Sequence, residues 1–205
     1  MAQPKWQRRS DDRPREICAA ALELFAEKGF AAAKLDEIAR RAGVSKGTLY
    51  LYFKNKQELF RAVVKSAIAP NIEAITSAVA SLDAPFTDVI RMFLAGFAER
   101  EARLPIGAVA KIVVGESRNF PELARVWHDE VASKAIGALS AFIERAQQRG
   151  EVRPGDPRLY AFSLIGPMVL GALWRATLVP AGGTPLDLAA LAKQHSETVL
   201  AGLLE

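Results

Sequence analysis

The segment KGTLYLYFKNK, residues 46–56, gathers side chains that can bind nucleic acid at the spacing of one short helix. An ammonium group can reach a guanine or a phosphate, a threonine can touch a base edge or a thymine methyl, and tyrosine hydroxyls can donate to phosphate oxygens. A glycine weakens a helix by roughly 0.5–1 kcal/mol relative to alanine, yet it lets the backbone come close to a groove. The candidates for such contacts are Lys46, Gly47, Thr48, Tyr50 and Tyr52.

Two short helices joined by a tight turn would present these groups. A helix-turn-helix needs a small residue where its helices cross, a glycine in the turn, an apolar residue after it and another in the second helix. The sequence supplies these four in order as Ala39, Gly43, Val44 and Leu49. Ser45 can cap the second helix by accepting a bond from a free backbone N–H. A plain helical hairpin weakened by a glycine is the alternative interpretation.

The segment LDEIARRAGVSKGTLYLYFKNKQELF, residues 35–60, closely resembles the DNA-binding domain of the TetR family of bacterial transcriptional regulators. The resemblance covers about the first 60 residues. It implies a ligand-responsive repressor that binds a palindromic operator in double-stranded DNA as a homodimer and is released by a small molecule. The positions that match the family's DNA contacts are Lys34, Ser45, Lys46, Gly47, Thr48, Tyr50, Tyr52 and Lys56.

One of these positions departs from the family pattern. The family usually has Thr or Ser where Lys34 stands, and a lysine cannot accept the capping bond at the start of the helix that follows. Its charge can still contact a phosphate. Further along, KIVVGESRNFPELARVWHDEV, residues 111–131, resembles the AefR-like branch of the same family.

Composition and charge agree with a DNA-binding module at the N-terminus. Net charge is +4 over 205 residues, but residues 1–65 alone carry 14 Lys and Arg against 8 Asp and Glu. Positive charge concentrated in one third of a chain suits a polyanionic partner. The single cysteine, Cys18, suits a reducing cytoplasm, and the polar, basic start has no signal-peptide pattern. The longest apolar run, residues 159–174, is short for a membrane span.

The pattern of apolar residues and of prolines and glycines predicts an all-α protein of about nine helices. The expected domains are a basic flexible tail over 1–14, a three-helix DNA-binding domain over 15–60, and an effector-binding and dimerisation domain over 61–205. Helices are expected near 15–28, 35–42, 46–52, from 56 onward, from 85, after 105, over 121–149, 157–178 and 186–204. Pro70 is expected to kink or split the fourth.

The last two helices are expected to form the dimer interface, because a penultimate helix that is apolar nearly all round needs partners on more than one side. A purely intramolecular core is the alternative. The predicted interface residues are Leu159, Phe162, Ile165, Val169, Leu173, Leu188, Leu191, Val199 and Leu203.

The middle helices are expected to enclose a pocket for a hydrophobic or amphipathic effector. Binding would favour a conformer in which the fourth helix moves the recognition helices out of register with DNA. The predicted walls and polar anchors are Phe93, Phe97, Ile112, Val113, Glu116, Trp127, His128, Met168, Trp174 and Arg175.

Three other interpretations remain open at this point. A regulator without a small-molecule effector would have the same DNA-binding motif. A helical enzyme is disfavoured, because the only histidines, His128 and His195, stand far apart and no metal or nucleophile motif is present. A redox role for Cys18 competes with that of a small buried core residue. We expect no cofactor and no metal, and the operator and effector are not encoded in any motif.

Overall fold

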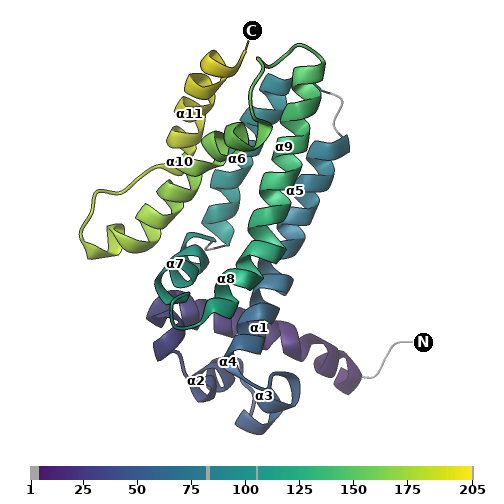
Figure 1. Ribbon diagram of the computed structural model, residues 1–205. Coiled ribbons are helices and arrows are strands. Elements are labelled where there is room, and N and C mark those ends of the chain that lie inside the picture. The colour runs from purple at the N-terminus through teal and green to yellow at the C-terminus, as the bar shows by residue number, and fades with distance from the viewer. Residues whose placement is uncertain (1–4, 82–83, 105, 205) are drawn as a thin grey trace.

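The computed structural model describes residues 5–81, 84–104 and 106–204, leaving aside the side chains of 5–11, 67, 71, 75 and 78–81. Throughout these residues the regular secondary structure is helical (Figure 1). The all-α prediction is therefore confirmed. The helices are α1 (Lys5–Ala32), α2 (Leu35–Arg41), α3 (Lys46–Tyr52), α4 (Lys56–Val63), α5 (Ala69–Ser81), α6 (Phe86–Arg103), α7 (Ile106–Glu116), α8 (Pro121–Trp127), α9 (Ser133–Gln148), α10 (Pro157–Thr177) and α11 (Leu188–Leu203).

Two pairs of these helices are continuous rods, so the described residues form about nine separate helices, as predicted. A π-helical turn, η1 (Val64–Ile68), joins α4 to α5, and a second, η2 (His128–Ala132), joins α8 to α9. Pro70 is the second residue of α5, two positions after the end of η1. Its ring cannot sit against the carbonyl four residues earlier in a regular helix, and the wider turn accommodates it without ending the rod.

Helices α1 to α3, with the start of α4, lie at one end of the molecule, and the longer helices extend away from them (Figure 1). The short helices α3 and α4 each begin with a side-chain cap. The Ser45 side chain accepts a bond from the N–H of Thr48, and the Asn55 side chain accepts one from the N–H of Glu58. Lys34 makes no side-chain cap at α2, as the sequence predicted.

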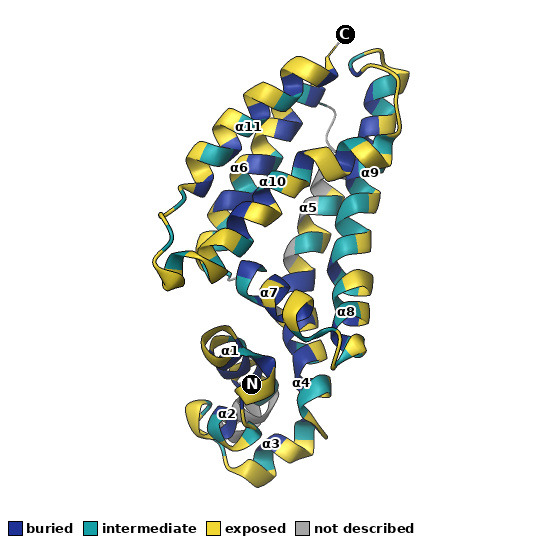
Figure 2. Ribbon diagram, turned by 60° about the vertical axis from the view of Figure 1, so that its left-hand side comes forward, coloured by how far each residue is buried: buried dark blue, intermediate teal, exposed yellow. Residues whose placement is uncertain are grey.

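Two hydrophobic cores organise the chain, and the buried positions of Figure 2 follow them. The first joins α1 to α4 with α7 and α8, and includes Phe25, Phe30 and Phe60. The second lies among α6, α9, α10 and α11. The first core therefore crosses the expected boundary near residue 60, because Val109 and Ile112 of α7 belong to it.

The N-terminal segment differs from its expectation. Residues 1–14 were expected to be a flexible tail, but α1 begins at Lys5 and runs through Pro14. The stop expected at Gly29 is visible as a break in helical geometry, with φ of 78° at that residue. Only glycine adopts such an angle at little cost, so α1 bends there before it ends at Ala32.

Candidate functional site

Helix α3 presents one apolar side to the protein and its remaining surface to solvent. Leu49 is fully buried, whereas Leu51 is 83% exposed and Tyr50 44% exposed. The Ser45 hydroxyl accepts a hydrogen bond from the backbone N–H of Thr48 at 3.0 Å and lies 2.8 Å from its hydroxyl. The cap thus fixes the start of α3 and leaves Lys46 and Gly47 exposed beside it.

Gly47 has no structural requirement for glycine. Its φ is not positive, and an added Cβ would meet only the Ser45 hydroxyl, at 3.7 Å. An alanine would therefore fit and would favour the helix. A glycine retained at an exposed helix position is consistent with a partner that comes close to the backbone, as the sequence suggested.

Lys46, at the start of α3, has a partner within the domain. The Lys46 ammonium lies 2.9 Å from the Asp36 carboxylate, and this hydrogen bond raises the pKa of Lys46. Both side chains are exposed, so solvent screens the pair and its contribution is small. Lys46 can therefore exchange Asp36 for a phosphate. Lys34 is exposed at the start of α2.

Lys56 is held more firmly than a DNA contact would suggest. Its ammonium donates to the carbonyls of Phe30, Ala31 and Ala33 at 2.6, 2.8 and 3.0 Å, and lies 4.7 Å from the centre of the Phe30 ring. Burial lowers its pKa. The residue therefore closes the carboxyl end of α1, and its predicted contact with DNA would require it to leave these carbonyls. Tyr52 is half-buried, its ring 6.4 Å from that of Phe53.

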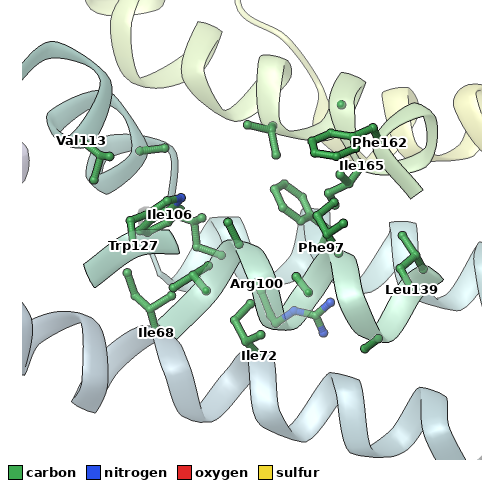
Figure 3. A pocket seen from close by; sticks show the side chains of 18 of the residues that line it. Ile68, Ile72, Phe97, Arg100, Ile106, Val113, Trp127, Leu139, Phe162 and Ile165 are labelled. Atoms are coloured by element: carbon green, nitrogen blue, oxygen red, sulfur yellow. The ribbon is translucent and has the colours of Figure 1, made fainter. Parts of the chain in front are cut away.

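A cavity of about 370 Å³ lies between the longer helices. It is almost wholly apolar, and its size is within the range of roughly 300–1,000 Å³ typical of small-molecule sites. Figure 3 shows its walls converging from α5, α6, α7, α9 and α10. The lining residues are Ile68, Ile72, Thr76, Phe93, Phe97, Arg100, Leu104, Ile106, Ala110, Val113, Val114, Trp127, Val131, Ala132, Ala135, Ile136, Ala138, Leu139, Phe162, Ile165, Gly166, Val169 and Leu173.

Four of the predicted pocket residues line this cavity: Phe93, Phe97, Val113 and Trp127. The other apolar candidates lie elsewhere, because Ile112 belongs to the first core and Met168 to the second. The Trp174 indole N–H donates to the carbonyl of Thr184 at 2.9 Å.

The predicted polar anchors also lie outside the cavity. Glu116 accepts a hydrogen bond from the N–H of Ala31, and exposed His128 lies 2.8 Å from the Asp129 carboxylate. Arg175 does not line the cavity; its charge acts on Glu101 instead.

The charged group that does line the cavity, Arg100, was missed. Phe93, Phe97 and Arg100 follow helical spacing on one side of α6, and Leu104 comes directly after its last residue. A lone arginine in an apolar stripe was the available signal. Ile68 and Ile72 were missed because nothing in the sequence shows that the α4–η1–α5 rod, which begins in the DNA-binding domain, continues as far as the cavity.

The predicted dimer residues fall into three groups. Leu159 and Phe162 of α10 are 63% and 50% exposed, as an interface in a single chain requires. Leu188 and Leu203 of α11 are buried in the second core of the same chain. The remaining predictions are partly buried or pocket-lining: Ile165, Val169, Leu173, Leu191 and Val199.

Helix α10 is rich in apolar residues. The stretch Pro157–Ala181 is long and apolar enough to cross a membrane by length and composition, and one such helix is weak evidence for a span. Exposed Leu159, Leu170 and Trp174 account for much of its surface. An unpartnered apolar face on a helix is also what a subunit interface provides.

Helix α7 connects the cavity to the DNA-binding end. Ile106 and Ala110 line the cavity, while Glu116 at the other end accepts a hydrogen bond from the backbone N–H of Ala31 at 3.0 Å. The ring of Phe120, just after α7, lies 5.0 Å from that of Phe30. The rod α4–η1–α5 makes a second connection, since Phe60 lies in the first core and Ile68 lines the cavity.

Glu101 sits at the junction of α6, α7 and α10. Its carboxylate accepts bonds from the N–H of Gly107 at 3.2 and 3.1 Å. Burial raises the pKa of Glu101 to about 7, against the opposing effects of these bonds and of the Arg175 charge. Gly107 is required here, because an added Cβ would lie 2.4 Å from the carbonyl oxygen of Ala172 on α10.

Comparison with known proteins shows the family to which the chain belongs. The pattern of the family described as "Bacterial regulatory proteins, tetR family" matches residues 17–63, and that of "Tetracyclin repressor-like, C-terminal domain" matches residues 81–190. The HTH-type transcriptional regulator YhgD of Bacillus subtilis (strain 168) is 29% identical over 160 residues, which cover 76% of this chain and 80% of YhgD.

Two solved structures share the fold. SmeT in its triclosan complex has a TM-score of 0.75 at 26% identity, covering 94% of this chain and 92% of SmeT. FadR from Bacillus subtilis, in complex with stearoyl-CoA, also has a TM-score of 0.75, at 23% identity, covering 92% of this chain and 98% of FadR.

The chain belongs to the TetR family of bacterial transcriptional regulators. It is a DNA-binding, ligand-responsive regulator of the repressor type that acts on operator DNA as a homodimer. The AefR-like resemblance of residues 111–131 stays a prediction.

Proposed function

We propose that α3 reads the operator and that the apolar cavity is the site of the effector that releases it. The observation that carries this proposal is structural continuity. Among the elements that line the cavity, α7 and the α4–η1–α5 rod also pack in the core of the DNA-binding domain. A ligand that favours one position of these helices must alter the position of α3 in the same step.

The role proposed for each DNA-binding residue follows from how far its side chain is exposed. Lys46, Gly47, Thr48 and Tyr50 project from α3 and are the residues placed for groove and phosphate contact. Ser45 positions them through its cap. Lys34 adds phosphate contact from α2, and Tyr52 and Lys56 contribute from the edge of the site.

The proposed dimer places the exposed face of α10 against a second copy, with α11 completing a four-helix interface. Two copies then present two α3 helices to half-sites one helical turn of DNA apart, or a multiple of it. The proposed domains are a DNA-binding domain over 15–60 and an effector and dimerisation domain over 61–205. The activity is regulation in the cytoplasm and not catalysis.

An apolar effector of modest size is favoured by the walls of the cavity. SmeT, which is 26% identical to this chain, binds triclosan, a precedent for a small ligand in the same fold. A regulator without an effector is disfavoured, because an empty apolar cavity of about 370 Å³ forfeits packing that a folded core would otherwise make.

The test is equilibrium binding of the purified protein to the DNA upstream of its own gene. A scrambled duplex, two salt concentrations and a Tyr50→Ala variant complete the design. We expect selective binding that weakens steeply as salt rises and is lost with Tyr50. Equal binding to both duplexes, unaffected by Tyr50→Ala, would contradict an operator role for α3 at this DNA.

A further inference from the structure

One charge stands in the wall of the effector cavity. Among the described residues that line it, Arg100 alone carries a formal charge, and the polar remainder is the Thr76 hydroxyl and the Trp127 indole N–H. Figure 3 shows the guanidinium nitrogen atoms among side chains that are almost wholly carbon. An arginine is a poor choice for an apolar wall unless it has a partner there.

The Arg100 guanidinium has no such partner within the chain. In the part of the protein that the structure describes, it forms no ion pair and donates no hydrogen bond. It is half-buried, and burial lowers its pKa, an effect that the charge of Glu99 opposes. The group nonetheless stays charged at any physiological pH.

Gly96, one turn earlier on α6, makes the room for this group. An added Cβ at Gly96 would lie 2.9 Å from Nη1 and 3.1 Å from Nη2 of Arg100. The guanidinium therefore folds back over the bare backbone of Gly96. A glycine at this point of a helix is unfavourable by roughly 0.5–1 kcal/mol relative to alanine, so its presence is consistent with a need for that position.

We propose that the effector is an amphipathic monocarboxylic acid whose carboxylate binds Arg100 and whose apolar tail fills the cavity. This rests on the proposed function of the cavity and specifies its ligand. A planar guanidinium matches a carboxylate through two parallel hydrogen bonds, and such charged bonds gain strength in an apolar enclosure. One cation selects one anion, because a ligand with further charges would leave them desolvated and unpaired.

The test compares decanoate with 1-decanol, which share a chain and differ in charge. Binding of each is followed by calorimetry and by the fluorescence of Trp127, which lines the cavity. We expect decanoate to bind about 10- to 100-fold more tightly than decanol, a ratio that corresponds to about 1.4–2.7 kcal/mol of charged hydrogen bonding. Arg100→Met should abolish this preference and leave decanol binding unchanged.

A second variant keeps the arginine and moves it. Gly96→Ala places a methyl group where the guanidinium lies and favours the helix, so the protein stays folded while decanoate affinity falls and decanol affinity does not. Arg100→Lys, which retains the charge without the two-pronged geometry, should recover part of the preference.

The outcomes distinguish a failure of the carboxylate assignment from a failure of the proposed role of the cavity. If both ligands bind equally in the parent protein and in Arg100→Met, the cavity is an effector site but the carboxylate assignment is wrong. If neither ligand binds, the assignment and the proposed role of the cavity both fail. Preference for decanoate that survives Arg100→Met would also overturn the assignment, since the charge would then be read elsewhere.

Discussion

The DNA-reading end and the effector cavity are built in opposite ways. The first is local: α2, its turn and α3 lie within residues 35–52, and the cap that starts α3 is made by a residue three positions away. The cavity is assembled from helices α5 to α10, with lining residues that span 68–173. A local motif leaves a pattern in the sequence, whereas a cavity exists only after distant helices have packed.

The two regions meet at the carboxyl end of α1, where the largest stability effect is expected. Lys56→Met removes the ammonium that three carbonyls share, leaving Phe30 O and its neighbours without that donor. We expect a loss of about 1.5–3 kcal/mol in the free energy of unfolding, measured by urea titration. Lys54→Met, at an exposed position beside it, is the matched control and should change stability little.

The structural role of Lys56 would be contradicted if the residue acts in DNA binding and not in stabilising the fold. In that case the variant would keep its stability and lose affinity for the operator. The account expects the reverse order of effects, with stability falling first and DNA binding weakened only through the loosened end of α1.

Gly47→Ala separates folding from recognition at α3 itself. The added methyl has room, so the helix should gain roughly 0.5–1 kcal/mol of stability. Affinity for operator DNA should nevertheless fall, because the methyl stands between backbone and groove. Gly115→Ala on α7, where an added Cβ also meets nothing, is the control that should gain stability without losing DNA binding. Unchanged affinity in Gly47→Ala would remove the argument for close approach.

Lys46→Ala should have a smaller and more uniform effect. The side chain exchanges Asp36 for phosphate, so its loss should lower the slope of log affinity against log salt by about one per half-site. Lys193→Ala, an exposed lysine on α11 far from α3 in the chain, should leave the slope unchanged. An unaltered slope in Lys46→Ala would show that the Asp36 pair persists on DNA.

The smallest effect expected is a pH dependence at the edge of the cavity. Because the pKa of Glu101 is raised to about 7, the folded chain keeps a proton between pH 4.5 and 7 that the unfolded chain releases. Stability from this group therefore falls as pH rises through that window. Glu101→Gln should melt progressively higher than the parent as pH rises from 4.5 to 8.

The control for this pH dependence is Glu99→Gln, an exposed carboxyl on the same helix. A constant difference in melting temperature between Glu101→Gln and the parent at all pH values would contradict the shift. Arg175, whose charge opposes it, must be kept unchanged in both variants.

The contrast between local and distant construction also explains which predictions succeeded. The bounds of α3, the cap by Ser45 and the missing cap at Lys34 follow from residues within one or two turns, and the structure confirms them. The all-α class and the number of rods follow from apolar periodicity and from prolines. Lys56 shows the limit of local prediction. Its position is typical of a DNA contact, yet its ammonium binds backbone carbonyls that lie 23–26 residues earlier in the chain.

The pocket shows the same limit more strongly. Phe93 and Phe97 were predicted because aromatic residues on one helix face need a partner. Met168 and Ile112 have the same pattern and lie in solid core, since periodicity shows that a face is buried but not whether side chains or a cavity cover it. Arg100 was missed because whether it faces solvent or a cavity depends on which helices pack around it.

The most direct test of the account is reciprocity between its two regions. The dissociation constant for operator DNA is measured with and without saturating decanoate or decanol, whichever binds more tightly, and that ligand's dissociation constant is measured with and without DNA. Linkage requires both constants to rise by the same factor, and we expect about 5- to 150-fold. A ligand that binds in the cavity with unchanged affinity whether or not DNA is present would contradict the coupling of cavity to α3.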